Sequence, residues 1–490
     1  MVAELIAPYR KYTRDTILAG IASVAIALKG FILLPILSKT LGAQAYGIWS
    51  QIQVTIALLT LLAVLQLGFA MTRFLAGEAD KSKVGTGFFS ILALTSSISI
   101  VLSTLVFVLA EPIAAAVFGG IQAASLVRLA AFLVLLATID QMIIEYFMTL
   151  RQMGKYSIFI IAQTTSEIAL IAYLVFSGFG LYGVIAALLV IRALLFLVGF
   201  FTIKSQIKPS VPSLSVIKAY LVFTLPLVPA GLYLWIYTLS DRYIIGYFLG
   251  AEAVGIYSAA CILGTTLGLF FDPLAVVLLP AITYLYENGK IQEVKTHLKY
   301  SLKFYLTFSI PSVIGLSILA KPLLATLTTA EFVAGFMIVP VIALATAVLN
   351  SSAIITRVLL LFKRTGVIGL IYGAAAVINV AMNIVLVPVI GILGAAISTL
   401  AASMLVLALT SVISFKRFPF DVDRRFIVKA IVSSLIMGAV IWKLNPNGAV
   451  SILVSVIIGA LTYFVILGLL RGFTREEYNL FRGFLASLKD

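Results

Sequence analysis

The chain has few charged residues for its length. Of its 490 residues, 11% are Asp, Glu, Lys or Arg and 62% are apolar, whereas a soluble domain carries about 25% charged residues. This composition leaves too few polar side chains to cover a surface that faces water on all sides. It also leaves no long polar linker, such as a soluble chain of this length needs between its domains.

Cysteine and histidine are nearly absent, which narrows the chemistry further. Cys261 and His297 are the single residues of their kinds, so an intramolecular disulfide is excluded and a histidine-based metal site or catalytic triad is disfavoured. The sequence contains no GxxxxGK[ST] motif for nucleotide phosphates, which disfavours an ATP-driven pump. We therefore predict a protein that is not an enzyme and has no metal or cofactor.

The net charge of +15 does not indicate a nucleic-acid-binding protein. The basic residues lie between apolar runs and form no continuous basic patch. The lipid bilayer is the partner that this composition favours.

Apolar runs long enough to cross about 30 Å of hydrocarbon follow one another along the chain. They are too long and too uniformly apolar for the alternation of a membrane barrel, so we predict an all-α membrane protein with about fourteen transmembrane helices. The predicted spans are Thr16–Leu37, Tyr46–Leu75, Gly87–Ala110, Ala124–Met148, Tyr156–Phe176, Tyr182–Ile203, Ile217–Leu239, Ala253–Leu285, Leu302–Ala320, Phe336–Leu361, Gly366–Val387, Ile392–Phe415, Phe426–Ile441 and Val450–Leu470.

Lys and Arg residues predict the orientation of these spans. Most of the 34 lie before the first span or after an even-numbered one, and the opposite side holds only Lys39, Arg128, Arg242, Lys321 and Lys443. Because loops rich in Lys and Arg stay in the cytoplasm, both ends of the chain are predicted to be cytoplasmic. We interpret the first apolar run as a retained span of a multi-pass protein of the cell (plasma or inner) membrane, rather than as a signal peptide.

A duplicated segment divides the chain. Leu41–Ser50 reads LGAQAYGIWS and Leu249–Ser258 reads LGAEAVGIYS, identical at seven of ten positions and 208 residues apart. A second pair follows at nearly the same offset, since Gly180-Leu-Tyr-Gly183 precedes the sixth span and Gly391-Ile-Leu-Gly394 the twelfth. Each unit then holds six spans, an even number, so both copies enter the membrane in the same direction.

This repeat predicts two parallel six-helix lobes around a central cavity, an architecture suited to alternating access. The predicted domains are an N-terminal lobe over 1–208, a C-terminal lobe over 209–418, and two extra helices with a cytoplasmic amphipathic tail over 419–490. In the tail, Thr474 and Glu477 have the spacing of a capping box. The basic stretch Glu287–Lys303 is likewise predicted to lie on the inner leaflet.

The repeated segments resemble a known family. LGAQAYGIWS, the stretch DRYIIGYFLGAEAVGIYSAA from Asp241, and the region of Asn379, Asn383, Pro388 and GILGAA are similar to polysaccharide flippases. These belong to the superfamily that also holds multidrug-and-toxin extruders and the lipid II flippase, and the resemblance covers essentially the whole chain. It implies transport of lipid-diphosphate-linked oligosaccharide from the inner to the outer leaflet, for cell-surface polysaccharide biosynthesis. It also implies other polysaccharide-assembly membrane proteins as partners.

Three ionisable residues lie deep within the predicted spans of the first lobe. Lys29, Glu167 and Arg192 are each eight to ten residues from an outer helix end, which places them about 12–15 Å below the boundary. An ionisable group at this depth is costly and usually faces the interior of the bundle. The equivalent positions in the second repeat are uncharged, so we predict a charged centre confined to the first lobe, with a net positive balance.

These residues have two interpretations. In the first, Lys29 and Arg192 line the cavity and attract a diphosphate, for which the planar fork of arginine is suited. In the second, Glu167 and Arg192 form a buried structural ion pair across a hairpin. Both hold together if the pair opens when substrate binds.

The remaining candidate site residues each have more than one interpretation. Arg357 is either a third substrate-binding cation or a side chain that extends to the inner interface, as we also read Glu145. Asp140 and Asp272 are candidate acids for binding H⁺ or Na⁺, and the Asp272-Pro273 step is predicted to interrupt helix hydrogen bonding. Asp241 and Arg242 are either an outer gate or a helix cap beside a loop.

Two rival functions remain at this point. A drug or metabolite antiporter of the same fold would bind cations, which the positive balance disfavours. A membrane glycosyltransferase or polymerase is suggested by Asp421-Val-Asp423, but this D-x-D lies in a short loop beside Arg424 and Arg425, where a solvated charge run is the simpler interpretation.

Overall fold

The computed structural model of the protein describes residues 2–118 and 120–473, and every regular element among them is a helix. This confirms the all-α prediction. The elements are α1 (Val2–Val64), α2 (Leu67–Leu75), α3 (Lys81–Val108), α4 (Ala110–Val117), η1 (Ile121–Ala123), α5 (Ala124–Thr149), α6 (Met153–Leu174), η2 (Val175–Phe179), α7 (Gly180–Lys204), α8 (Leu214–Thr224), η3 (Leu225–Leu227), α9 (Val228–Leu239), α10 (Asp241–Thr265), α11 (Gly268–Glu287), α12 (Ile291–Leu327), η4 (Ala330–Gly335), α13 (Ile338–Leu361), α14 (Thr365–Ile390), α15 (Ile392–Arg417), α16 (Arg424–Leu444) and α17 (Ala449–Leu469).

The chain forms two compact units. The first comprises residues 1–262 and 369–402, and the second comprises 263–368 and 403–490. The first unit therefore contains α1 to α9 with most of α10 and α14, and the second contains α11 to α13 with α16 and α17. The division into two lobes and a C-terminal pair stays a prediction of the repeat.

Twelve helical stretches in the described part of the chain are long and apolar enough to cross a membrane. Three of them, Gly20–Val64, Met153–Lys204 and Leu214–Thr265, have 45, 52 and 52 residues. A helix rises about 1.5 Å per residue, so each is roughly twice as long as a single crossing requires. The exact number of fourteen spans is therefore not fixed by this count, although the multi-pass character is clear.

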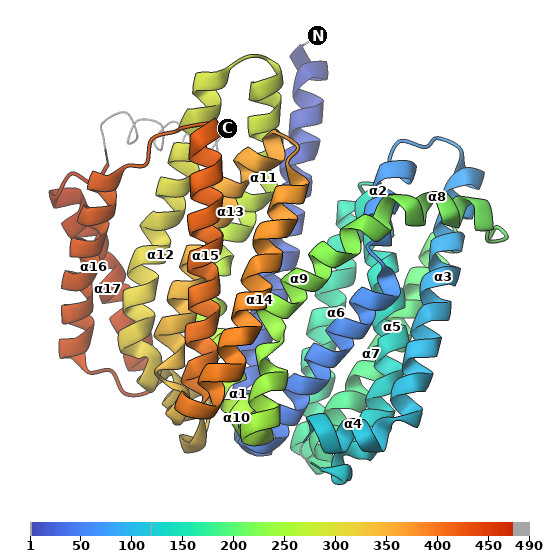
Figure 1. The fold of residues 1–490 in the computed structure, drawn as a ribbon, viewed down its shortest axis with the longest axis horizontal. Helices are drawn as coiled ribbons and strands as arrows, with labels where there is room; N and C mark the ends of the chain where they lie inside the picture. The colour runs from blue at the N-terminus through green and yellow to red at the C-terminus, as the bar shows by residue number, and fades with distance from the viewer. Residues whose placement is uncertain (1, 119, 474–490) are drawn as a thin grey trace. The chain divides into compact units, whose positions relative to one another are not determined.

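Glycines break the long helices at the repeated segments. Gly42 in α1 has φ 76° and ψ 174°, and Gly250 in α10 has φ 83° and ψ 176°. This backbone region is essentially restricted to glycine, because any Cβ clashes there. Figure 1 shows α1 running away from the N-terminus and then returning as a lighter blue segment. The two glycines are 208 residues apart, so the duplicated sequence produces the same turn twice.

The two copies of the repeat pack directly against each other within the first unit. A Cβ added to Gly47 would lie 2.9 Å from the nitrogen of Gly255, and one added to Gly255 would lie 3.0 Å from the nitrogen of Gly47. Each would also overlap a backbone carbonyl, that of Ala251 or of Ala43. Only glycine allows two helix backbones to approach this closely, and small residues serve the same purpose in membrane helices generally.

Two spans predicted to be continuous are interrupted by turns, and the seventh contains the 3₁₀ helix η3 between α8 and α9. The second predicted span breaks at Leu65 and Gln66, both with positive φ (49° and 60°), and the eighth breaks in a turn at Thr266 and Leu267. Asp272 and Pro273 both lie within α11, so the helix continues through this step. Pro273 is the sixth residue of α11 and has no N–H for the carbonyl of Leu269, so the helix lacks one hydrogen bond there, as the sequence predicts.

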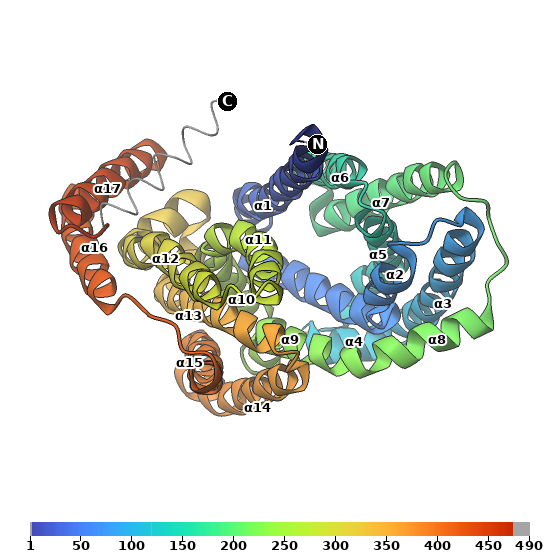
Figure 2. The same ribbon diagram turned by 90° about the horizontal axis from the view of Figure 1, so that it is seen from above.

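Packing in the first unit is organised around α5. This helix contacts α1, α3, α6 and α7, and Figure 2 shows it surrounded by them when seen from above. More than half of its membrane-spanning window is buried. Lipid is as apolar as leucine, so van der Waals contact rather than the hydrophobic effect holds these helices together. Close packing on all sides of a central helix fixes the positions of its side chains.

The second unit is built on α12, which packs against α11, α13, α16 and α17. Residues from Ile291 to Lys303, predicted to lie on the inner leaflet as a separate helix, form the first turns of this 37-residue helix. The predicted amphipathic tail, including Thr474 and Glu477, lies outside the described residues.

Candidate functional site

A cavity of about 720 Å³ lies in the first unit. Its wall is formed by α1, α5, α6, α7 and α9, together with the break between α1 and α2. The lining residues of α1 beyond Gly42 include Gln53, Ile56, Ala57, Thr60, Leu61 and Val64. This spacing of three and four residues places them on one helix face, as the geometry of an α-helix requires.

Four ionisable side chains meet on one part of this wall. Lys29 of α1 forms an ion pair with Glu167 of α6. The Arg192 side chain of α7 lies between two acids, with Nη1 3.3 Å from Oδ2 of Asp140 and Nε 3.7 Å from Oε1 of Glu167. The two carboxylates are buried, at 0% and 2% exposed, whereas the Lys29 and Arg192 side chains are 24% and 18% exposed. The cations are therefore the accessible members of the cluster.

Three of these four residues were predicted from the sequence to lie at the same depth. Lys29, Glu167 and Arg192 come together as their depth predicted, and the contact between Glu167 and Arg192 is present. The prediction of a net positive charge at this centre is wrong. Asp140 joins the cluster, which then contains two cations and two acids. The sequence alone does not group Asp140 with the other three residues. It does not reveal that α5 packs centrally and directs the Asp140 side chain toward α7.

Uncharged polar groups and aliphatic side chains line the rest of the cavity, and the polar ones were not predicted as site residues. Gln53, Gln66, Gln141, Gln163, Thr60, Thr164, Thr238, Tyr156 and Trp235 all contribute to the wall. Gln163 donates from Nε2 to Oε1 of Glu167 at 3.1 Å. Thr60 Oγ1, Trp235 Nε1 and Asp140 Oδ1 are buried and have no hydrogen-bond partner among the described residues. Glutamine within an apolar run is a signal that identifies four of these nine residues, Gln53, Gln66, Gln141 and Gln163.

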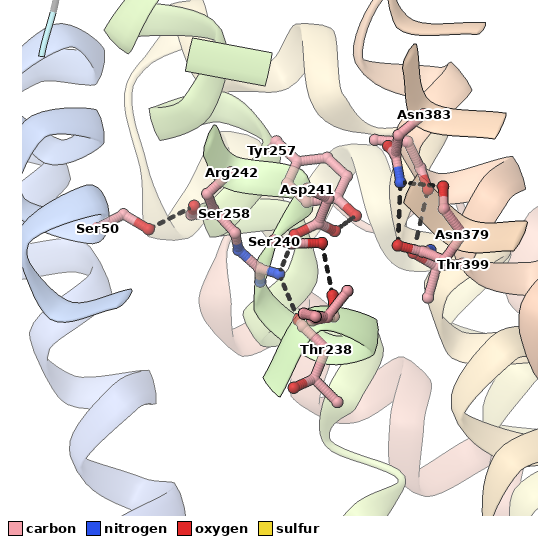
Figure 3. A network of polar contacts seen from close by, with 12 residues as sticks. Ser50, Thr238, Ser240, Asp241, Arg242, Tyr257, Ser258, Asn379, Asn383 and Thr399 are labelled. Atoms are coloured by element: carbon pink, nitrogen blue, oxygen red, sulfur yellow. Dashed lines mark hydrogen bonds and ion pairs between the residues drawn. The ribbon is translucent and has the colours of Figure 1, made fainter. Parts of the chain in front are cut away.

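Asp241 and Arg242 form a compact polar network with Tyr257 where α9 meets α10 (Figure 3). Arg242 Nη1 donates to Asp241 Oδ1 at 2.7 Å and to the carbonyl of Thr238 at 2.7 Å, and the Tyr257 hydroxyl donates to Asp241 Oδ2. A cation that binds the last carbonyls of a helix stabilises its C-terminus. This geometry fits the interpretation as a helix cap, and the role as an outer gate stays a prediction.

Two further contacts in Figure 3 involve residues of the duplicated segment and of the region around Asn379 and Asn383 that resembles polysaccharide flippases. The hydroxyls of Ser50 and Ser258, equivalent positions of the two copies, are 2.7 Å apart. On α14, Asn383 Nδ2 donates to the carbonyl and side-chain oxygens of Asn379 at 2.9 and 3.1 Å. Both asparagines are fully buried, so they hold structure within the first unit.

Arg357 and Asp272 belong to the second unit. Arg357 Nη2 donates to the backbone carbonyl of Ala275 at 3.4 Å, and Asp272 is exposed on α11. Their predicted roles in substrate binding and ion coupling are neither supported nor opposed by these contacts.

The D-x-D residues are engaged in structural contacts. Asp423 accepts a hydrogen bond from the Phe426 N–H at 2.9 Å, which caps α16, and lies 3.0 Å from Lys303 Nζ. Burial would raise the pKa of Asp423, but these two hydrogen bonds and the charges of Lys303 and Lys299 outweigh it and lower the pKa. Asp421 lies 3.7 Å from Lys299. Both acids thus join the loop to α12.

The fold defines a class, a multi-pass helical membrane protein, whose first unit contains a cavity lined in part by charged and polar side chains. Residues 12–285 match the family model described as "Polysaccharide biosynthesis protein", and the chain belongs to this family. The resemblance noted from the repeat is thereby confirmed.

Curated relatives and solved structures agree with this assignment. The chain is 26% identical over 258 residues to "Probable flippase AglR" of Haloferax volcanii, covering 50% of this chain and 53% of the relative. It is 23% identical over 237 residues to "Probable low-salt glycan biosynthesis flippase Agl15" of the same organism, covering 47% and 49%. The chain therefore matches about half the length of these curated relatives.

Among solved structures, the lipid II flippase MurJ in an inward closed conformation has a TM-score of 0.75 and 18% identity, covering 92% of this chain and 98% of that one. The MATE multidrug transporter DinF-BH has a TM-score of 0.62 and 15% identity, covering 84% and 96%. At this level of identity the likeness shows a shared fold.

Proposed function

We propose that the protein carries a lipid-diphosphate-linked oligosaccharide from the inner to the outer leaflet by alternating access. The observation that carries this proposal is the cavity of about 720 Å³ in which Lys29 and Arg192 are the accessible charges. Its volume lies within the range of about 300–1,000 Å³ that is usual for ligand pockets. The family and the flippase relatives support the same function.

The cavity addresses the main physical obstacle to flipping. A charged diphosphate with sugars must pass about 30 Å of hydrocarbon in which unsatisfied polar groups are very costly. A wall that offers two cations and many uncharged donors and acceptors replaces the water that the head group loses. Arg192 grips phosphate oxygens with its planar fork and Lys29 adds a compact positive charge. The lipid tail stays in the bilayer.

The two acids are the coupling groups in this proposal. Lys29 and Arg192 are held by Glu167 and Asp140, so a diphosphate competes with carboxylates for the cations. Neutralising one carboxylate, with H⁺ or with Na⁺, releases a cation for phosphate. Separate imposition of a pH gradient and a Na⁺ gradient identifies the ion.

We also propose that both termini face the cytoplasm of the cell that makes the polysaccharide. In the first unit, segments predicted on the inner side lie together, since Gln152 donates to Gln206 at 2.5 Å. Segments predicted on the outer side also lie together, with Arg128 2.7 Å from Glu111. These contacts agree with the grouping of the segments by side, and the Lys and Arg distribution carries the choice of the cytoplasmic side. Association with other polysaccharide-assembly proteins is part of the same proposal.

A cation antiporter of the same fold is the second candidate, because multidrug transporters share the fold. Reconstitution into liposomes distinguishes the two. We expect the protein to expose an isoprenyl-diphosphate-linked trisaccharide to an exoglycosidase added on the opposite side, and not to transport ethidium. Transport of ethidium without movement of the glycolipid would overturn the proposal in favour of the antiporter.

A further inference from the structure

The cavity wall has a second part that carries no charge. Its lining residues from the later part of α1, the break after it and α9 include no Asp, Glu, Lys or Arg. They include Gln53, Thr60, Gln66, Trp235 and Thr238. The charged residues come instead from the part of α1 before Gly42 and from α5, α6 and α7. The wall therefore has one part that holds all the charged residues and a second part, of mixed polar and apolar residues, that holds none.

The backbone presents Gln66 to the cavity at a local cost. Leu65 and Gln66 adopt left-handed conformations, at φ 49° and 60°, which are unfavourable for residues other than glycine. This break ends α1 and lets α2 start at Leu67. Interrupted helices are tolerated at membrane depth where they line a cavity, since exposed backbone groups then avoid lipid. The break is thus in a position where it adds polar groups to the wall.

Gly231 makes room for the Gln66 amide. A Cβ at position 231 would overlap Nε2 of Gln66 and lie 3.3 Å from its Cδ. Gly231, Leu234, Trp235 and Thr238 follow one face of α9, at helical spacing. The side chain of Gln66 and the face of α9 are therefore neighbours in the wall.

Two polar groups in this part have unused hydrogen-bonding capacity. Thr60 Oγ1 and Trp235 Nε1 are buried without a partner among the described residues, and Thr60 is only 7% exposed. A buried polar group without a partner is costly, so such groups usually form hydrogen bonds with protein, water or a ligand. A ligand rich in both donors and acceptors would satisfy a hydroxyl, an indole N–H and planar amides at once.

We propose that Gln66, Thr60 and Trp235 form a subsite for the sugar of the substrate, beside the charged part that takes the diphosphate. Sugars present hydroxyls that donate and accept, and apolar ring faces that stack on aromatic side chains. The subsite contains an amide, a hydroxyl and an indole but no charge, which matches a neutral sugar. This inference rests on the proposed function, because it assumes that a glycosylated lipid diphosphate occupies the cavity.

The test compares two ligands on the full-length protein in nanodiscs. Farnesyl diphosphate probes the charged part alone, and farnesyl diphosphate bearing N,N′-diacetylchitobiose probes both parts. We expect the wild type to bind the glycosylated ligand more tightly, by at least about fivefold, which corresponds to one neutral hydrogen bond. Gln66→Leu and Trp235→Leu should each remove about fivefold of this advantage and leave farnesyl diphosphate binding unchanged.

Matched variants separate a sugar contact from a general loss of structure. Gln206→Leu makes the same change at a glutamine outside the cavity wall and should retain the advantage. Gly231→Ala displaces the Gln66 amide without altering it, and should act like Gln66→Leu. Its control is Gly154→Ala, where a Cβ meets nothing within 4 Å. Size-exclusion profiles and melting temperatures identify any variant that fails to fold, and Thr60→Val then takes its place.

The possible results separate this inference from the proposed function. Equal affinity of the wild type for both ligands, or a proportional loss for both in Gln66→Leu and Trp235→Leu, would overturn the sugar subsite alone. Binding of neither ligand by the wild type would overturn the proposed function and the subsite together. A selective loss for the glycosylated ligand, with Arg192→Ala weakening both ligands, is the result that supports the inference.

Discussion

Lys29 of α1 and Glu167 of α6 form an ion pair in the cavity wall, with Glu167 buried and Lys29 partly exposed to the cavity. Because Arg192 also contacts Glu167, one carboxylate is shared by two cations. Removing one partner of a buried ion pair leaves the other without compensation, so such pairs are sensitive to ligands and protons. This relationship makes Glu167 the residue whose charge decides how strongly the cavity attracts an anion.

Glu167→Gln should strengthen binding of farnesyl diphosphate by about three- to tenfold, because an acid that competes for both cations is removed while hydrogen bonding is kept. Isothermal titration calorimetry with the purified protein measures the change. The same variant should lose the dependence of transport on the coupling ion.

The matched control is Glu111→Gln. Glu111 pairs with Arg128 at 2.7 Å, but both side chains are exposed, at 59% and 41%. An exposed pair contributes little, so this variant should bind the ligand as the wild type does. Weaker binding in Glu167→Gln would contradict the role of Glu167 as a competitor of the diphosphate.

Gly47→Ala and Gly255→Ala should each lower the melting temperature of the detergent-solubilised protein. The added methyl group overlaps a backbone carbonyl of the other repeat copy, and overpacking of this kind costs about 1–3 kcal/mol or more. Gly30→Ala serves as the control, since its Cβ would meet only Ile262, at 4.0 Å. Alanine is a better helix former than glycine, so the control should be neutral or stabilising. Equal melting temperatures for all three variants would show that the repeats do not cross where the structure places them.

Asp423→Asn tests the contact between α12 and the loop before α16. The pKa of Asp423 is lowered in the folded protein, so its contribution to stability is present above the ordinary aspartate pKa of about 3.9 and is lost as the pH falls through the lower folded value. The variant should therefore melt at a lower temperature than the wild type at pH 7. The difference should shrink progressively below about pH 4. A difference that is constant from pH 7 to pH 3 would argue against the Lys303–Asp423 contact.

Much of the fold could be predicted because its signals are local. Apolar runs, the Lys and Arg distribution and the duplicated LGAxAxGIxS all act through short stretches of chain, and the depth of Lys29, Glu167 and Arg192 followed from helix length alone. Depth alone did not place Asp140 with them, since its side-chain direction depends on how α5 packs. The break at Leu65 and Gln66 carries no proline or glycine to mark it. Gln66 and Trp235 were missed because an uncharged polar residue in a span is unremarkable until a cavity gives it a position.

The central claim is that Lys29 and Arg192 bind the diphosphate during flipping. Liposomes containing an isoprenyl-diphosphate-linked trisaccharide, assayed by exoglycosidase accessibility, test it with Lys29→Ala, Arg192→Ala and the control Arg128→Ala. Each hydrogen bond to a charged group contributes about 1.5–3 kcal/mol, so the first two variants should lose at least tenfold in flipping rate, to the point of abolition, while remaining folded. Arg128→Ala should flip at the wild-type rate. Full activity of both Lys29→Ala and Arg192→Ala would contradict the account.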